Sequence, residues 1–268
     1  MKRFFASIFR KFVALNVSVS KALNSMLPKR LSVDGNRFFL DQLAPDKFSA
    51  NDLVFDVGGG SRPYISVEKK QELKLTIVGL DIDEIELLKA PQGSYDEIIA
   101  HDLCTFSGSQ NANIVICQAT LEHLPNTAGA VRAISTILKP GGSALIFAPS
   151  RNALFARLNL LLPQKLKEKI LYTIEPGEEV VEHQGFPAHY DKCTPREIEE
   201  LAKEFGLEIT QRHLFWVSSY FFNFVPAFLI WRLWQGILYL VVKENAAETF
   251  AYVLTKPEDS VDESIVER

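Results

Sequence analysis

The chain has 268 residues, of which 47% are hydrophobic, and carries a formal net charge of −4 at pH 7. This length suits one large α/β domain with additions, and the negative charge argues against a nucleic-acid binder. The three cysteines, Cys104, Cys117 and Cys193, are widely spaced and form no CxxC or Cys/His cluster. The sequence therefore predicts no metal site and no disulfide framework, and it favours a reducing cytoplasm.

Residues 1–34 form a basic N-terminal segment. Its apolar residues recur at helical spacing, and its opposite face is basic, so we expect an amphipathic helix that either packs on the domain or lies on an anionic membrane surface. Arg10 and Lys11 interrupt the apolar run, which argues against a secretory signal peptide. The apolar positions are Phe5, Ile8, Phe9, Phe12 and Leu15, and the charges are Lys2, Arg3, Arg10, Lys11, Lys21, Lys29 and Arg30 against Asp34.

From residue 52 onward, short apolar strands alternate with helices. This alternation predicts a Rossmann-like α/β fold with a seven-stranded, mostly parallel sheet, an antiparallel last strand and helices on both faces. Residues 175–191 read as a loop, and Thr194 as the N-cap of the helix that follows. We expect strands at 53–57, 75–80, 97–100, 113–118, 143–148, 207–214 and 249–254, and helices at 128–138, 157–162, 164–172 and 195–205.

A glycine-rich turn, Asp56-Val57-Gly58-Gly59-Gly60-Ser61-Arg62, follows the first strand. Glycine tolerates positive φ and leaves room for a ligand against the main chain. In open α/β sheets, nucleotides bind beyond the carboxyl ends of the strands, at such a turn. Asp81 ends the second strand, where a carboxylate can accept hydrogen bonds from both ribose hydroxyls. The turn therefore predicts a nucleotide site. Asp81 could instead only cap the following helix.

A long apolar stretch, residues 215–245, separates the sixth and seventh strands. Its length makes it a transmembrane candidate, but strands that pair in one sheet must keep both of its ends on one side of a bilayer. Pro226 predicts a break between two shorter helices, and thus a monotopic or re-entrant pair. A soluble subdomain stays open as the alternative. The aromatic load is typical of membrane interfaces and comprises Phe221, Phe222, Phe224, Phe228, Trp231, Trp234 and Tyr239.

With these elements in order, the chain resembles the class I S-adenosylmethionine-dependent methyltransferases, in particular the bacterial small-molecule, lipid or sugar enzymes of the methyltransferase type 11 kind. The resemblance covers residues 50–214 and the strand near 250. The motifs that carry it are Val54-Phe55-Asp56-Val57-Gly58-Gly59-Gly60, Val78-Gly79-Leu80-Asp81-Ile82-Asp83, His101-Asp102-Leu103, Asn113-Ile114-Val115-Ile116-Cys117-Gln118 with Leu121-Glu122-His123-Leu124, and Leu138-Lys139-Pro140-Gly141-Gly142.

The resemblance implies S-adenosylmethionine as methyl donor and S-adenosylhomocysteine as product. It implies that Asp102 bonds the adenine amino group, that Leu103 adds a backbone contact, and that Gln118 and Ala119 face the methionine and methyl groups. Arg62 replaces a usual glycine, and Asn113 replaces a common acid at the start of the fourth strand, where we expect a structural effect only. The expected cofactor residues are Asp56, Gly58, Gly59, Gly60, Asp81, Ile82, Asp102, Leu103, Gln118 and Ala119.

The catalytic candidates are His189, His183 and Tyr190, which lie in a stretch that could close over a substrate and supply a general base. His123 reads as a satisfied histidine at a helix start. We divide the chain into an N-terminal segment (1–34), a methyltransferase domain (35–257, with a substrate-side insert at 150–192 and the hydrophobic insert at 215–245) and an acidic disordered tail (258–268).

The expected function is methyl transfer to a small or lipid-linked acceptor in the cytoplasm, with peripheral contact on the inner face of the cytoplasmic membrane. No nucleic-acid partner is expected, and a homodimer stays open. One alternative is a nicotinamide-dependent oxidoreductase, against which Pro63 counts because a glycine or alanine is needed there. The other is an inactive, methyltransferase-like protein that binds membranes.

Overall fold

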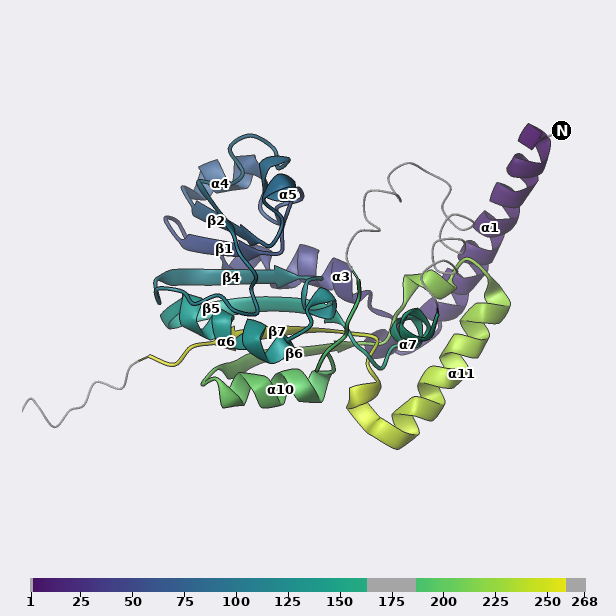
Figure 1. Ribbon diagram of the computed structural model, residues 1–268. Coiled ribbons are helices and arrows are strands. Elements are labelled where there is room, and N and C mark those ends of the chain that lie inside the picture. The colour runs from purple at the N-terminus through teal and green to yellow at the C-terminus, as the bar shows by residue number, and fades with distance from the viewer. Residues whose placement is uncertain (1, 163–186, 259–268) are drawn as a thin grey trace, which may run out of the picture.

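The computed structural model describes residues 2–162 and 187–258. Within these, one seven-stranded sheet has the order β3-β2-β1-β4-β5-β7-β6, and only β7 runs against the others. The predicted fold class is confirmed (Figure 1). The strands are β1 (Leu53–Val57), β2 (Thr76–Asp81), β3 (Glu97–Ala100), β4 (Ala112–Gln118), β5 (Leu138–Pro149), β6 (Glu208–Phe215) and β7 (Thr249–Thr255).

The central strands are apolar because both of their faces are covered. Val115 of β4 packs with helices α6 (Thr127–Ile137) and α10 (Pro195–Glu204) in one core cluster. Ile114 and Ile116 face the other side, where they pack with Phe39 and Leu43 of the π-helical turn η1 (Phe39–Leu43). Burial on both faces is the expected state of a parallel strand. On that other side of the sheet lie α3 (Gly35–Phe38), α4 (Val67–Leu73) and α5 (Glu84–Leu88).

Two long helices lie together beyond the carboxyl ends of the parallel strands, α1 (Lys2–Ser25) and α11 (Val225–Val242) (Figure 1). The Asn16 amide oxygen accepts from the Val225 N–H at 3.0 Å, and Asn24 accepts from the Arg232 guanidinium. The short α2 (Lys29–Ser32) connects α1 to the domain. The predicted N-terminal helix is thus present, and it extends to Ser25, beyond the apolar repeat that ends at Leu15.

The polarity of α1 is inverted relative to a helix of a soluble core. Its buried positions are polar, namely Asn16, Ser20 and Asn24, which follow each other at four-residue spacing and face the protein. Five of its large apolar side chains point outward instead. They are Ile8, Phe9, Phe12, Leu15 and Val19, each at least 39% exposed. A surface helix normally has the opposite arrangement.

The predicted break at Pro226 is wrong. Pro226 lies in the first turn of α11, where the missing N–H costs nothing, and the helix then runs unbroken to Val242. It is preceded by a short 3-10 turn, η4 (Ser219–Phe221), and followed by another, η5 (Lys243–Ala246). The insert is therefore one long helix with a turn at each end. Proline starts helices as readily as it ends them, so the sequence alone does not distinguish a helix start at Pro226 from a break.

The remaining boundaries follow the local signals closely. Thr194 caps α10 by accepting from the Glu197 N–H, and Gly206 ends this helix with φ of 71°. Helix α7 (Leu154–Leu161) begins earlier than predicted, and β5 extends back to Leu138 through an irregular stretch at 139–142. The helix predicted at 164–172 lies outside the described residues, as does most of the acidic tail.

Candidate active site

The glycine turn lies at the carboxyl end of β1, between β2 and β4. Gly58 and Gly60 have φ of 74° and 49°, in the region that side chains disfavour. A Cβ on Gly58 would lie 2.4 Å from the Thr120 hydroxyl, so only glycine fits there. Around a Cβ on Gly60 the nearest atoms would be 3.5 Å away. The turn is therefore tight on its Thr120 side and open at Gly60.

Asp56 stabilises this turn through its side chain. Its buried carboxylate accepts a hydrogen bond from the Tyr64 N–H at 2.8 Å, across the turn. A Cβ on Gly59 would lie 2.7 Å from the same carboxylate. Burial raises the pKa of the Asp56 carboxyl to about 6, because the charged form loses its hydration. The contacts of Asp56 are thus with the backbone of the turn.

Asp81 lies at the tip of β2 and faces the open side of the turn. A Cβ on Gly60 would lie 3.5 Å from Asp81 Oδ2, and Asp81 Oδ1 accepts from the Asp83 N–H at 3.0 Å. The cap of α5 is Asp83, which accepts from the Ile85 N–H at 2.9 Å. Asp81 is therefore not the helix cap that the alternative required. Ile82, beside it, is 62% exposed.

The other predicted cofactor residues follow around the same edge of the sheet. Asp102 accepts from the Cys104 N–H at 2.8 Å, and Leu103 is buried. Gln118 donates its amide to Asn36 Oδ1 at 3.0 Å, which links the end of β4 to α3. Ala119 turns away from β4 with φ of 51°. Farther back, Asn113 accepts from the Leu53 N–H, the structural role expected of it.

This edge of the sheet fits S-adenosylmethionine. The open backbone at Gly60 leaves space for the amino-acid and ribose parts, and the carboxylate of Asp81 adjoins that space, where it would hold the ribose hydroxyls. Because β4 lies next to β1, Ala119 would come near the methyl group. The predicted residues thus lie at the carboxyl ends of four adjacent strands, β3, β2, β1 and β4.

A cavity of about 440 Å³ continues from this site across the ends of β4, β5 and β7. Ala119 N–H donates to the Phe147 carbonyl, and Ser150 N–H donates to the Glu248 carbonyl, so the cavity runs from Ala119 to Glu248 past the end of β5. Its lining includes Asn36, Ala119, Glu122, His123, Phe147, Pro149, Phe155, Tyr190, Ser218, Tyr220, Glu248 and Thr249. The Phe155 and Tyr220 rings stack with centroids 4.1 Å apart.

Glu122 lines the same cavity and follows Ala119 by three residues in the chain. It is 5% exposed, and among the described residues its Oε2 atom has no hydrogen-bond partner. Burial raises the pKa of the Glu122 carboxyl to about 8. Its main-chain carbonyl accepts from the N–H groups of His189 and Tyr190, at 2.8 and 2.9 Å. The residue is fixed by its backbone, and the Oε1 atom of its carboxylate lies 3.9 Å from Nε2 of His123.

The three predicted catalytic residues have different surroundings. Tyr190 lines the cavity and is 2% exposed, and burial raises the pKa of its hydroxyl far above the usual value. His189 is exposed and is not part of the cavity wall, and His183 lies outside the described residues. His123 lines the cavity at the end of the 3-10 turn η3 (Leu121–His123).

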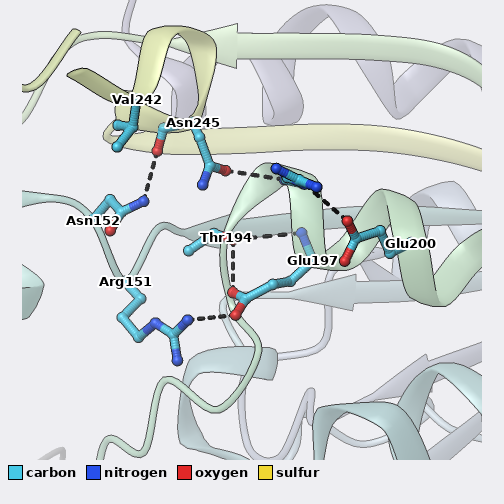
Figure 2. Close-up of a pocket in the computed structure, with 8 residues that line it drawn as sticks. Arg151, Asn152, Thr194, Glu197, Glu200, Val242 and Asn245 are labelled. Carbon is cyan, nitrogen blue, oxygen red and sulfur yellow. Dashed lines mark hydrogen bonds and ion pairs between the residues drawn. The ribbon is translucent and has the colours of Figure 1, made fainter. Parts of the chain in front are cut away.

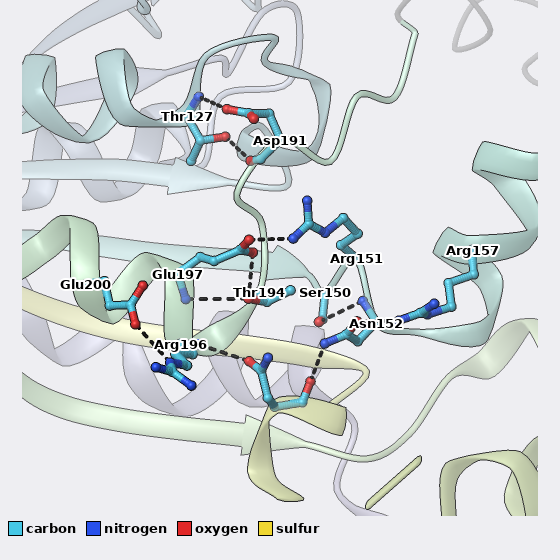
Figure 3. A network of polar contacts seen from close by, with 11 residues as sticks. Thr127, Ser150, Arg151, Asn152, Arg157, Asp191, Thr194, Arg196, Glu197 and Glu200 are labelled. Carbon is cyan, nitrogen blue, oxygen red and sulfur yellow. Dashed lines mark hydrogen bonds and ion pairs between the residues drawn. The ribbon is translucent and has the colours of Figure 1, made fainter. Parts of the chain in front are cut away.

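A separate polar groove is lined by residues that follow β5, by the start of α10 and by the end of the hydrophobic insert (Figure 2). There Arg151 bonds Glu197 of α10, and the Asn152 amide donates to the Asn245 carbonyl of η5 at 2.9 Å. Figure 3 shows how Thr127 at the start of α6 holds Asp191. The polar side chains of this groove are paired with one another or with neighbouring backbone groups. These bonds connect the residues after β5 to α10 and to η5, at the end of the hydrophobic insert.

Metal-binding clusters were predicted to be absent. No group of three or more histidine, cysteine or acidic side chains suited to a metal occurs in residues 2–162 and 187–258. All three cysteines are buried and free.

The comparisons with known proteins agree with this geometry. A family model described as "Methyltransferase domain" matches residues 31–212. The ubiquinone biosynthesis O-methyltransferase of Thiobacillus denitrificans is 28% identical over 196 residues, which cover 70% of this chain and 74% of that protein. The protein of the same name from Ralstonia nicotianae is 30% identical over 141 residues, and the match covers 50% of this chain and 54% of that one.

Solved structures share the fold at low sequence identity. A methyltransferase in complex with the Haloferax volcanii Trm112 activator is 14% identical with a TM-score of 0.53, over 84% of this chain and 89% of that one. The [4+2]-cyclase SpnF is 15% identical, also with a TM-score of 0.53, over 85% and 86%. These likenesses concern the fold alone. The family match decides the chemistry, and this chain belongs to the methyltransferase-domain family as an S-adenosylmethionine-dependent methyltransferase.

Proposed function

We propose that this enzyme methylates a hydroxyl group of a small or lipid-linked acceptor while it is bound to the inner face of an anionic membrane. The observation that carries the proposal is the position of the cavity. It begins beside Ala119 and Glu122, and it is walled by Asn159 of α7 and Tyr220 of η4, next to helices whose apolar side chains face outward.

The proposed chemistry uses the carboxylate of Glu122 as a general base. When bound, the cofactor supplies an electrophilic methyl group. The acceptor oxygen forms the new bond to that methyl group as the S–CH₃ bond breaks, and Glu122 takes the hydroxyl proton. A carboxyl group with a pKa of about 8 is well matched to this task near neutral pH. Tyr190, neutral in its buried position, would orient the acceptor through its hydroxyl group.

The names of the similar proteins support oxygen as the methylated atom and an amphiphilic acceptor. Those proteins are O-methyltransferases of ubiquinone biosynthesis. Ubiquinone carries a long isoprenoid tail, so a related acceptor would be held in lipid and would reach the enzyme at a membrane surface. Their matched segments cover only part of each protein, so the acceptor is inferred from the cavity as well.

Membrane contact is supported by two adjoining apolar surfaces. On α11 the outward side chains include Ile230, Leu233, Leu240 and Val241, each at least 65% exposed, and α1 exposes five more. Within the described chain, residues 225–246 alone have the length and mean hydropathy, 1.6, to cross a membrane, but only 17% of that stretch is buried. Since β6 and β7 pair in one sheet, α11 would lie in the interface, parallel to the surface.

The charge of the N-terminal segment agrees with an anionic membrane. Arg10, Lys11 and Lys21 are exposed on α1, beside the apolar side chains of the same helix, and Lys29 and Arg30 follow on α2. An apolar face combined with a basic one gives more stable attachment than either alone. Large exposed apolar patches of this kind mark interaction sites in soluble proteins.

A matched pair of variants tests the membrane part. Leu233→Asp on α11 and Leu88→Asp on α5 alter side chains that are 66% and 67% exposed, at opposite ends of the molecule. We expect only Leu233→Asp to reduce sedimentation with phosphatidylglycerol-containing vesicles, by about tenfold. Equal losses in the two variants, or equal binding of the wild type to vesicles with and without anionic lipid, would contradict the proposal.

The acceptor class is tested with methyl-labelled S-adenosylmethionine. The enzyme is incubated with a lipid extract and with an aqueous extract from cells that lack the protein. We expect base-stable label in the lipid extract, as an ether-linked methyl group on a hydroxyl-bearing lipid. Label on nitrogen would contradict the proposed O-methylation, and label confined to the aqueous extract would contradict methylation of a lipid-linked acceptor at the membrane.

A further inference from the structure

The end of the cavity that lies away from the cofactor carries a second buried carboxylate, Glu248. Because β7 is antiparallel, its first residue lies at the same sheet edge as the carboxyl end of β5, where Thr249 pairs with Pro149. Glu248 precedes this position, and its carbonyl accepts from the Ser150 N–H at 2.8 Å. Both Glu248 and Thr249 line the cavity.

One of the two oxygens of the Glu248 carboxylate already accepts hydrogen bonds from the protein. Oε1 accepts from the Trp231 indole N–H at 2.8 Å and from the Gln235 amide at 3.4 Å, both from α11. Oε2 accepts no hydrogen bond within residues 2–162 and 187–258, although Glu248 is only 3% exposed. The hydroxyl of the neighbouring Thr249 is likewise without a partner there. A buried carboxylate oxygen left unpaired is costly, so a ligand that pairs it gains affinity.

Two of the carboxylates that line the cavity, Glu122 and Glu248, lie on opposite sides of β5. Glu122 follows β4, Glu248 precedes β7, and β5 lies between these two strands. Adjacent strands are about 4.8 Å apart, so β4 and β7, with β5 between them, are separated by about 10 Å. An acceptor whose reacting hydroxyl lies at Glu122 must therefore extend past Phe147 and Pro149 to reach Glu248.

We propose that Glu248, with Thr249 beside it, binds a second hydrogen-bond-donating group of the acceptor, a hydroxyl or an N–H, and so determines which acceptors are methylated. The proposal rests on the proposed function and extends it. The preferred acceptor carries donors at two ends, one that is methylated near Glu122 and one that is held at Glu248. Glu248 is a specificity-determining residue and takes no part in the transfer itself.

Calorimetry with two biphenyls, measured in the presence of S-adenosylhomocysteine, tests this directly. 4,4′-Dihydroxybiphenyl has a hydroxyl at each end, and 4-hydroxybiphenyl has only one. We expect the wild type to bind the dihydroxy compound about tenfold more tightly, as one charge-assisted hydrogen bond provides. Glu248→Ala should reduce this ratio to about one. Glu244→Ala, at an exposed glutamate four residues earlier, should leave it at tenfold.

A third compound makes the test independent of any variant that fails to fold. In 4-hydroxy-4′-methoxybiphenyl the remote oxygen can accept but not donate, so the wild type should bind it like the monohydroxy compound. Equal affinity for the mono- and dihydroxy compounds, no binding of either, or an unchanged ratio in Glu248→Ala would each overturn the proposal. S-adenosylhomocysteine formation from the lipid extract, measured in parallel, reports separately on the proposed function.

Discussion

Trp231 donates its indole N–H to Glu248 Oε1 at 2.8 Å, and this bond joins the apolar helix α11 to the acceptor cavity. Trp231 is fully buried, and the guanidinium of Arg232 lies 4.2 Å from the centre of its ring. Arg232 in turn donates to Asn24 of α1. The two outer helices and the cavity are thus connected through three neighbouring side chains.

Replacing Trp231 with Phe keeps an aromatic ring in place and removes the bond to Glu248. We expect the free energy of unfolding to fall by about 1–3 kcal/mol, because a buried carboxylate oxygen loses the shorter of its two hydrogen bonds. Affinity for S-adenosylhomocysteine should stay unchanged, since the cofactor edge is several strands away. Urea unfolding and calorimetry measure the two effects.

Trp234→Phe is the matched control for that change. The indole N–H of Trp234 is buried and has no hydrogen-bond partner among the described residues, so its loss breaks no bond. An effect on unfolding as large as that of Trp231→Phe would show that the ring volume matters and the bond to Glu248 does not.

Methyl transfer should depend on pH through Glu122. The base form becomes the major form above the pKa of about 8, so kcat/KM should rise with pH and level off above that value. Glu122→Gln should lower kcat/KM by about 10²–10⁴-fold and remove this rise. A pH–rate profile of each protein, with the cofactor saturating and the acceptor well below its KM, provides the check. An unchanged profile in the variant would exclude Glu122 as the base.

The buried carboxyls should also make stability fall as the pH rises. Burial raises the pKa values of Glu122 and Glu248 to about 8 and about 7, above their ordinary value of 4.5. Between these values the folded state binds more protons than the unfolded state, so the free energy of unfolding decreases with increasing pH. Below pH 4.5 both states are protonated and the effect disappears.

Thermal unfolding at two pH values tests this sign. Glu122→Gln and Glu248→Gln should each raise the melting temperature relative to the wild type more at pH 8.5 than at pH 4.5. A larger relative gain at pH 4.5 would mean that the carboxylates are stabilised as anions in the folded protein.

Gly58→Ala should damage the cofactor turn selectively. The added Cβ meets the Thr120 hydroxyl at 2.4 Å, at a φ of 74° that alanine disfavours. We expect S-adenosylhomocysteine to bind at least about tenfold more weakly, as read by calorimetry. Gly236→Ala on α11, where a Cβ meets nothing within 4 Å, serves as the control and should leave this affinity unchanged.

Local patterns predicted the sheet well because each signal depended on residues close in sequence. The strand bounds 53–57 and 97–100 are the observed ones, and Thr194 and Gly206 begin and end α10 as expected. The position of Asp81 at the carboxyl end of β2 was predicted because it directly follows the apolar residues of that strand. Pro226 failed because a proline in isolation does not reveal which side of it is helical.

The acceptor side of the site could not be predicted in the same way. Glu122 lies within the Leu121-Glu122-His123-Leu124 motif and Glu248 lies in a connecting segment, but neither sequence context marks the carboxyl group as buried. Their environment is made by contacts with residues 189–190 and with Trp231 and Gln235 of α11. The inverted polarity of α1 was hidden for the same reason, since its partner is more than 200 residues away.

The antiparallel direction of β7 has a consequence for how such enzymes can diversify. It returns the insert that follows β6 to the reactive edge of the sheet, so one continuous segment, residues 216–248, contains both the outward apolar helix and the last carboxylate of the cavity. Under the roles proposed for α11 and Glu248, exchange of this segment between related enzymes would change membrane attachment and acceptor preference together, and would leave the glycine turn and Asp81 unchanged.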